Sequence, residues 1–192
     1  MSTRSYIMVR VPDSMIGQTI QFDAQKLPVK VGEFDYSAKR EENGFYPVKE
    51  QDAAKREPIT LEKKYIRIYH HNDGYPEGLG HALMAQYNTL EAVLNLIAGG
   101  ACSSCIGHYM GWAEYGNTDE YMLPEQTDEP RPDESYSYLF EDGQWRYYDF
   151  FYDRFKKSHD LKAKLQRDGI TMPLQRLLPL PFKMVDHLSE QD

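Results

Sequence analysis

The sequence predicts an α+β fold in which a mainly antiparallel sheet of about five strands carries two or three helices on one face. Three observations support this fold class. Short runs in which apolar and polar residues alternate recur along the chain and indicate strands. Residues 76–98 place apolar side chains at every third or fourth position, which indicates amphipathic helices. Finally, Asp142-Gly143 lies between two aromatic-rich runs, as in a tight hairpin.

The N-terminal half contains three predicted strands. Residues 5–11 alternate from Ser5 to Val11 and end before Pro12, and a second strand is predicted over residues 19–23. The third strand, residues 65–71, alternates isoleucines with tyrosines and Arg67. Between the second and third strands, residues 32–58 are rich in Lys, Glu, Gly and Asp. We expect these residues to form a flexible insertion.

Two consecutive helices are expected after the third strand. The first begins at Pro76, which suits the first turn of a helix because its missing N–H would be unpaired there. Thr89 is the predicted N-cap of the second helix, and Gly99-Gly100 is predicted to end it. A further strand is predicted over residues 106–113.

The hairpin is the clearest local prediction. A two-residue loop at Asp142-Gly143 would place Phe140 opposite Trp145 and Tyr138 opposite Tyr147, on a face that we assign to the core. Residues 151–168 are then predicted to form one helix that ends at Gly169. Four residues are assigned to its inner face: Phe151, Phe155, Leu161 and Leu165.

Length and charge limit the kinds of protein that this chain can be. A chain of 192 residues is expected to form a single domain over residues 1–192, with an extended tail at 170–192 where prolines alternate with leucines. The net charge of −8 argues against direct binding of nucleic acid, which needs clustered Lys and Arg. There is no apolar run of membrane-spanning length and no signal-peptide core, and only two cysteines are present. We therefore expect a cytoplasmic protein without membrane contact.

The junction between the third strand and the first helix is the predicted functional site, since a strand, a tight turn and a helix N-terminus meet there. The catalytic candidates are His71, Asp73 and Glu77, with the histidine as base and a carboxylate to orient it. The ligand-binding candidates are Arg4, Tyr69, His71, Asp73, Gly74, Tyr75, Glu77 and Gly78. A purely structural interpretation explains the same residue types: Asp73 caps the turn, Gly74 supplies its dihedral angle and Pro76 starts the helix.

A metal site is a second hypothesis. Cys102 and Cys105 form a Cys-x-x-Cys pair, and His108 follows them. Zinc prefers this mixture of thiolate and imidazole ligands, but one such pair supplies only half of a structural site. No cofactor is predicted, and zinc remains an alternative.

Four blocks of the sequence belong together: Ser2-Thr-Arg-Ser-Tyr-Ile-Met-Val9, Tyr69-His-His-Asn-Asp-Gly-Tyr-Pro-Glu-Gly-Leu-Gly80, residues 86–99 and residues 136–145. In this order they resemble a family of small bacteriophage and mobile-element proteins. The family has an N-terminal Thr-Arg-Ser strand and a Tyr-x-His-x-Asp-Gly-Tyr-Pro-Glu-Gly-like motif. At the second variable position of this motif the family has a Trp, whereas this chain has Asn72. The resemblance implies a phage or mobile-element protein that acts in the cytoplasm of its host cell.

The leading functional hypothesis is an accessory binding protein that engages a host protein or a small-molecule ligand, with antagonism of a host defence system as its concrete form. The chain has none of the common nucleotide-binding or hydrolase motifs, which favours a non-enzymatic role. The alternatives are a small hydrolase or transferase that uses His71, Asp73 and Glu77, and a structural protein held together by zinc. Homodimerisation through the hairpin edge or the apolar tail is left open.

Overall fold

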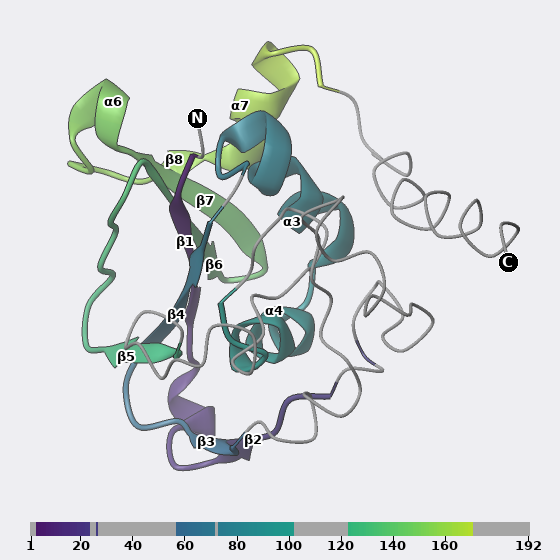
Figure 1. Cartoon of the computed structure of the whole chain (residues 1–192), viewed down its shortest axis with the longest axis vertical. Helices are drawn as coiled ribbons and strands as arrows, with labels where there is room; N and C mark the ends of the chain where they lie inside the picture. The colour runs from purple at the N-terminus through teal and green to yellow at the C-terminus, as the bar shows by residue number, and fades with distance from the viewer. Residues whose placement is uncertain (1–2, 24–25, 27–56, 72, 102–122, 171–192) are drawn as a thin grey trace, which may run out of the picture.

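A mixed six-stranded sheet forms the centre of the protein, as seen in the computed structural model, which describes residues 3–23, 26, 57–71, 73–101 and 123–170 (Figure 1). The order of its strands is β5-β4-β1-β6-β7-β8. Their bounds are β1 Ser5–Arg10, β4 Tyr65–His70, β5 Glu125–Thr127, β6 Tyr136–Glu141, β7 Gln144–Asp149 and β8 His159–Asp160. The predicted α+β class is confirmed, with a sheet that is mixed because β1 and β6 are parallel, while the other strand pairs in it are antiparallel.

Strand β1 lies between β4 and β6 in the middle of the sheet. Ile7 is opposite Ile68 of β4 on one side and opposite Tyr138 of β6 on the other. Met8 and Val9 are both buried although they point to opposite faces, so this strand has cover on both sides. The apolar run in β1 therefore reflects its central position.

A two-stranded sheet lies beyond the end of β1, where the chain passes through the short 3₁₀ helix η1 (Asp13–Met15). It pairs β2 (Thr19–Ile20) with β3 (Ile59–Thr60). The predicted strand at residues 19–23 is thus present but ends earlier. Beyond it the backbone N–H of Asp23 donates to Oδ1 of Asn95 at 2.8 Å, so its hydrogen bond goes to the helix layer.

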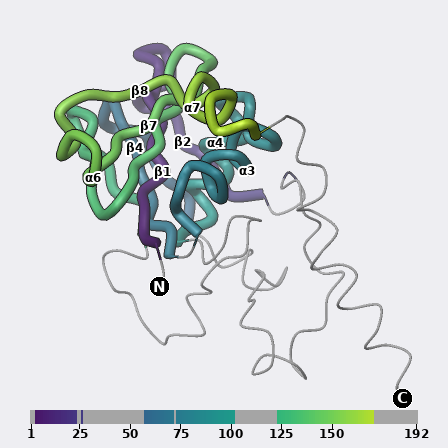
Figure 2. The backbone as a smooth tube through the Cα atoms, turned by 90° about the horizontal axis from the view of Figure 1, so that it is seen from above, coloured from purple at the N-terminus to yellow at the C-terminus, as the bar shows by residue number. Residues whose placement is uncertain are grey.

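Helices cover one face of the six-stranded sheet (Figures 1 and 2). They are the π-helical segment η3 (Pro76–Gly80), α3 (His81–Gln86), α4 (Leu90–Ala98) and α7 (Leu161–Arg167). The predicted cap of α4 is confirmed, because the backbone N–H of Ala92 donates to the hydroxyl of Thr89 at 3.2 Å. The helix α4 ends at Ala98, directly before the predicted glycine pair.

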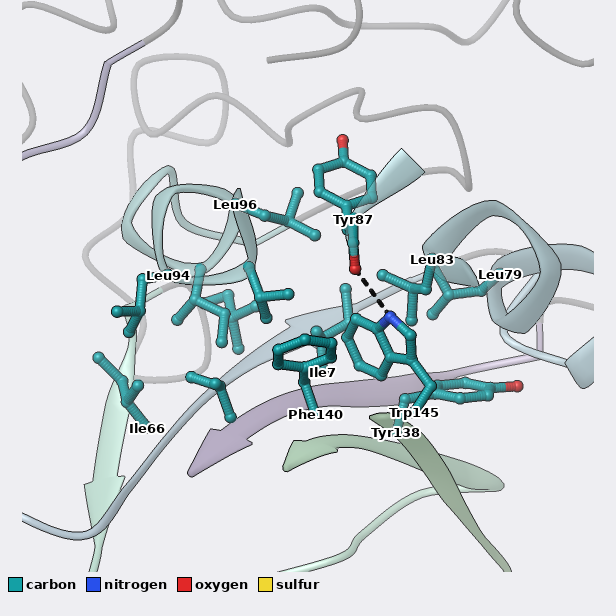
Figure 3. Close-up of a cluster of buried hydrophobic side chains, with 14 of the residues drawn as sticks. Ile7, Ile66, Leu79, Leu83, Tyr87, Leu94, Leu96, Tyr138, Phe140 and Trp145 are labelled. Carbon is teal, nitrogen blue, oxygen red and sulfur yellow. Dashed lines mark hydrogen bonds between the residues drawn. The ribbon is translucent and has the colours of Figure 1, made fainter. Parts of the chain in front are cut away.

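The core lies between the helices and the sheet, and the hairpin β6–β7 contributes four of its aromatic side chains: Tyr138, Phe140, Trp145 and Tyr147 (Figure 3). Phe140 is opposite Trp145, with ring centroids 5.1 Å apart, and Tyr138 is opposite Tyr147, as predicted. The Trp145 indole N–H donates to the backbone oxygen of Tyr87 at 2.8 Å, which ties the hairpin to the end of α3. The hairpin loop has positive φ at both central residues, Asp142 and Gly143, as this type of turn requires.

The single helix predicted for residues 151–168 is wrong. The chain forms the one-turn helix α6 (Phe150–Asp153), then the strand β8, and only then α7. Arg154 and Phe155 have φ angles of 58° and 61°, which is the left-handed region that ends a helix. Leu161 is buried as predicted, but Phe151 is 70% exposed instead of facing inward.

Several predictions fall on residues outside the described ranges. These are the strand at 106–113, residues 32–56 of the insertion predicted at 32–58, and residues 171–192 of the tail predicted at 170–192. Within the described ranges, the longest apolar helical segments are too short to cross a membrane.

Candidate functional site

The predicted site lies at one end of the six-stranded sheet. Across the sheet, His70 of β4 pairs with Ser5 of β1, Ser5 with Tyr136 of β6, and Tyr136 with Asp149 of β7. The segments that leave these four positions therefore gather at this end, which we call the site end. They are Arg4, the turn at residues 71–78 and the helix α6.

Hydrogen bonds from three directions hold the backbone of the turn. The N–H of Gly74 donates to the carbonyl of Thr3 at 2.9 Å, and the N–H of Leu79 donates to the carbonyl of Asp73 at 2.8 Å. The hydroxyl of Tyr138 donates to the carbonyl of Gly74 at 2.7 Å. Because Tyr138 is completely buried, its pKa is raised well above the ordinary value, and the hydroxyl stays protonated as a donor.

Close packing explains two glycines of the turn. A Cβ atom on Gly74 would lie 2.6 Å from both the Ser5 hydroxyl oxygen and the Thr3 carbonyl oxygen. A Cβ atom on Gly78 would lie 2.6 Å from the carbonyl oxygen of Asp73. Asp73 itself has a φ of 56°, a conformation that Asp tolerates better than most residues. Much of the Asp-Gly-Tyr-Pro-Glu-Gly block is thus the framework of a strand-to-helix junction.

The same framework presents polar side chains to solvent. Asp73, Tyr75 and Glu77 are exposed, whereas the residues between them are buried. Glu77 forms an ion pair with Lys164 of α7, with Oε1 and Nζ 3.4 Å apart, and Lys164 also binds Asp168. The turn is therefore connected to the helix layer by one of its exposed carboxylates.

His71 lies at the inner edge of the turn. Its Nδ1 is 2.9 Å from the hydroxyl oxygen of Tyr69. Burial lowers the pKa of His71, and the positive charge of Arg4 lowers it further, against a smaller opposing effect of Glu134. The imidazole is therefore neutral at neutral pH. Arg4 is close enough to act on His71 because β1 and β4 are paired.

The three catalytic candidates lie in one turn. However, the described hydrogen bonds of His71 and Glu77 are with residues other than these candidates. His71 is bonded to Tyr69, Glu77 is bonded to Lys164, and the side chain of Asp73 points to solvent. A base oriented by a carboxylate would need a His71–carboxylate contact. The described hydrogen bonds contain no such contact within the turn.

Sequence reasoning missed a buried cation on the opposite face of the sheet. Arg67, which is 3% exposed, binds Glu125 through Nε at 2.8 Å and donates to the carbonyl of Arg131 at 2.6 Å. Its guanidinium lies 4.1 Å above the centre of the Tyr6 ring, and that ring contacts Tyr69 edge-on. This row of side chains reaches the turn, because Tyr69 bonds to His71. The alternating pattern of residues 65–71 indicated only that Arg67 lies on the face of the strand opposite to the isoleucines.

Sequence reasoning also missed the exposed aromatic side chains of α6. Phe151 and Tyr152 are 70% and 77% exposed, and Phe151 contacts Tyr136 at the site end, with ring centroids 6.0 Å apart. Phe151, Tyr152 and Asp153, which precede Arg154, were assigned to a long amphipathic helix over residues 151–168. The left-handed residues that break this helix carry no signal in the sequence, because neither is Gly or Asn.

The predicted zinc ligands Cys102, Cys105 and His108 lie outside the described residues. Among residues 3–23, 26, 57–71, 73–101 and 123–170, no cluster of three or more His, Cys, Asp or Glu side chains is suited to hold a metal ion. The zinc hypothesis therefore stays a prediction.

Comparison with known proteins gives no significant match to a protein-family model, to a curated protein sequence or to a solved structure.

Proposed function

We propose that this chain is an accessory binding protein of a bacteriophage or mobile element, which engages a host protein or a small ligand through the turn at residues 71–78. Antagonism of a host defence system in the host cytoplasm is the concrete form of the proposal. It draws on the resemblance of the N-terminal strand and the turn to phage and mobile-element proteins.

The observation that carries the proposal is the contrast within the turn. Asp73, Tyr75 and Glu77 are exposed, while Gly74, which follows Asp73, and Gly78, which follows Glu77, are closely packed. A backbone that is already held loses little conformational entropy when a partner binds. An exposed tyrosine between two carboxylates offers apolar area, a hydroxyl and charge in one place, and tyrosine is enriched where binding energy concentrates.

The described hydrogen bonds favour binding over acid–base catalysis. A neutral His71 suits a general base, and this observation keeps the hydrolase or transferase alternative open. However, its described hydrogen bond is to Tyr69, and Glu77 is paired with Lys164. If the alternative holds, His71→Ala abolishes the biological effect while the melting temperature changes little.

The test is capture of a partner from a lysate of the host bacterium with two matched variants. Tyr75 and Ile16 are both 39% exposed, but Ile16 follows η1 at the end of β1 opposite to the turn. We expect a partner that is retained by the unmodified protein and by Ile16→Ser. Tyr75→Ser should retain about tenfold less of it, as for an interface hot spot.

Hydrogen–deuterium exchange on the resulting complex should show protection at residues 73–78. Repeated failure to recover a partner from concentrated lysate would count against the protein-partner form of the proposal. Native mass spectrometry of the purified protein then tests the small-ligand form, since an additional mass lost on denaturation identifies a bound molecule.

A further inference from the structure

The most exposed apolar surface among the described residues is the segment 149–159, which we call the aromatic corner. Phe151 and Tyr152 are 70% and 77% exposed, far more than any other large hydrophobic side chain in the described ranges. Burying apolar area of this kind is favourable, so this surface keeps binding energy available for a partner. Figures 1 and 2 show α6 standing at the site end, away from α3 and α4.

Local contacts define the backbone of the aromatic corner. Oδ1 of Asp149 accepts hydrogen bonds from the N–H groups of Phe151 and Tyr152 at 2.8 and 3.0 Å. Asp153 pairs with His159 of β8, with Oδ2 and Nε2 2.8 Å apart. The exposed rings are therefore presented by a capped helical turn that is tied to the edge strand.

These contacts also engage the acidic side chains of the corner. The carboxylates of Asp149 and Asp153 are engaged within it, as a helix cap and in the contact with His159. Arg154, Lys156 and Lys157 are exposed and form no ion pair with another described residue. The corner is thus a basic and aromatic surface on a chain whose net charge is −8. Its charge is complementary to an acidic partner.

The surroundings of the corner favour a protein over a polyanion. The exposed carboxylates of Asp73 and Glu77 lie at the same end of the sheet. An anionic membrane or a nucleic-acid strand across this end would meet them along with the cations. A protein segment can place its own carboxylates selectively, and Phe, Tyr and Arg are the residue types enriched at protein interfaces.

We propose that the aromatic corner docks an acidic segment of a protein partner. Apolar side chains of that segment contact Phe151 and Tyr152, and its carboxylates contact Arg154, Lys156 and Lys157. This inference rests on the proposed function as a binding protein and names the chemistry of its partner.

The test uses a displayed random-peptide library as the probe, selected against the immobilised full chain. Enriched peptides are synthesised with a fluorophore, and their dissociation constants are measured by anisotropy for the unmodified protein and four variants. Two variants change the corner, Phe151→Ser and Lys156→Glu. Tyr75→Ser changes the turn, and Ile16→Ser is the control at the opposite end of β1. Thermal unfolding checks that all four variants are folded.

We expect the enriched peptides to combine Asp or Glu with aliphatic or aromatic residues. Phe151→Ser and Lys156→Glu should each weaken their binding about tenfold or more, and Ile16→Ser should leave it unchanged. Raising the salt concentration should weaken binding to the unmodified protein, because exposed charge pairs are screened.

Three results would overturn the inference: no enrichment, enriched peptides without acidic residues, or equal affinity for Phe151→Ser. Phosphatidylcholine–phosphatidylserine vesicles and an oligothymidylate are measured in parallel, and Phe151-dependent binding to either one instead of the peptides would also overturn it. Peptide binding that is lost in Tyr75→Ser but kept in Phe151→Ser would exclude the corner and support the turn. The opposite pattern would support the corner and count against the turn as the binding site.

Discussion

The turn at residues 71–78 and the aromatic corner lie at the same end of the sheet, but their side chains are placed by different means. In the turn, the buried hydroxyl of Tyr138 binds the Gly74 carbonyl, and the Gly74 backbone packs against Ser5. In the corner, the carboxylate of Asp149 holds the backbone, and the side chains of Phe151 and Tyr152 are left in solvent.

This difference separates residues that the fold requires from residues that it does not. Gly74 and Gly78 have no room for a side chain, so packing alone accounts for their identity. Phe151 is mostly solvated, and the described contacts account for little of its surface. The fold thus requires the two glycines of the turn, whereas it does not require the exposed ring of Phe151 in the corner.

Among the variants of the turn and the corner, the largest effect is expected for Gly74→Ala. The new methyl group would meet the Ser5 hydroxyl and the Thr3 backbone at 2.6 Å, so one strand end must shift. Overpacking of this kind should lower the free energy of unfolding by about 2–3 kcal/mol, measured in urea. Gly169→Ala is the control, because its site is open and only its positive φ opposes the change, at about 1 kcal/mol. Equal losses in the two variants would show that the packing of the turn is not what requires glycine.

A smaller effect is expected for Tyr138→Phe, which removes one hydrogen bond and leaves the ring in place. The Gly74 carbonyl would lose its buried donor, and the free energy of unfolding should fall by about 1–2 kcal/mol. Tyr136→Phe is the matched control, since the Tyr136 hydroxyl has no hydrogen bond to another described residue. A loss no larger than that of this control would contradict the role assigned to the Tyr138 hydroxyl.

The smallest effect on stability is expected for Phe151→Ser in the corner. Because its ring is 70% exposed, the free energy of unfolding should change by less than about 0.5 kcal/mol. Phe140 is the same residue type but only 3% exposed, and Phe140→Ser should cost about 3–5 kcal/mol in the same urea titration. A large loss in Phe151→Ser would mean that the corner supports the fold, and the contrast with the turn would disappear.

The elements that the sequence predicted well are those defined by neighbouring residues. The hairpin depends on Asp142-Gly143, where both residues have positive φ, and the cap of α4 depends on Thr89 and the N–H three residues later. The strand–turn–helix junction follows in the same way from its turn residues and Pro76. Such signals lie within a few residues of one another and can therefore be recognised without knowledge of the rest of the fold.

The candidate site was predicted in position but not in its contacts. The sequence placed His71, Asp73 and Glu77 in one turn, and they are there. The partners of Glu77 and of the turn backbone come from distant segments: Lys164 of α7 binds Glu77, and Tyr138 of β6 binds the carbonyl of Gly74. No local sequence pattern indicates such contacts. The sequence of the turn therefore allowed a catalytic interpretation, which the described hydrogen bonds do not favour.

By itself, therefore, the sequence determined the class of the fold, its hairpin, the N-cap of α4 and the turn at residues 71–78. Only the tertiary structure decided that β1 runs parallel to β6, that Arg67 is buried against Glu125, and that Phe151 is exposed. The physical reason is the distance along the sequence over which each signal acts. Propensity and periodicity are read over one or two turns of chain, whereas burial and pairing depend on which remote segments meet.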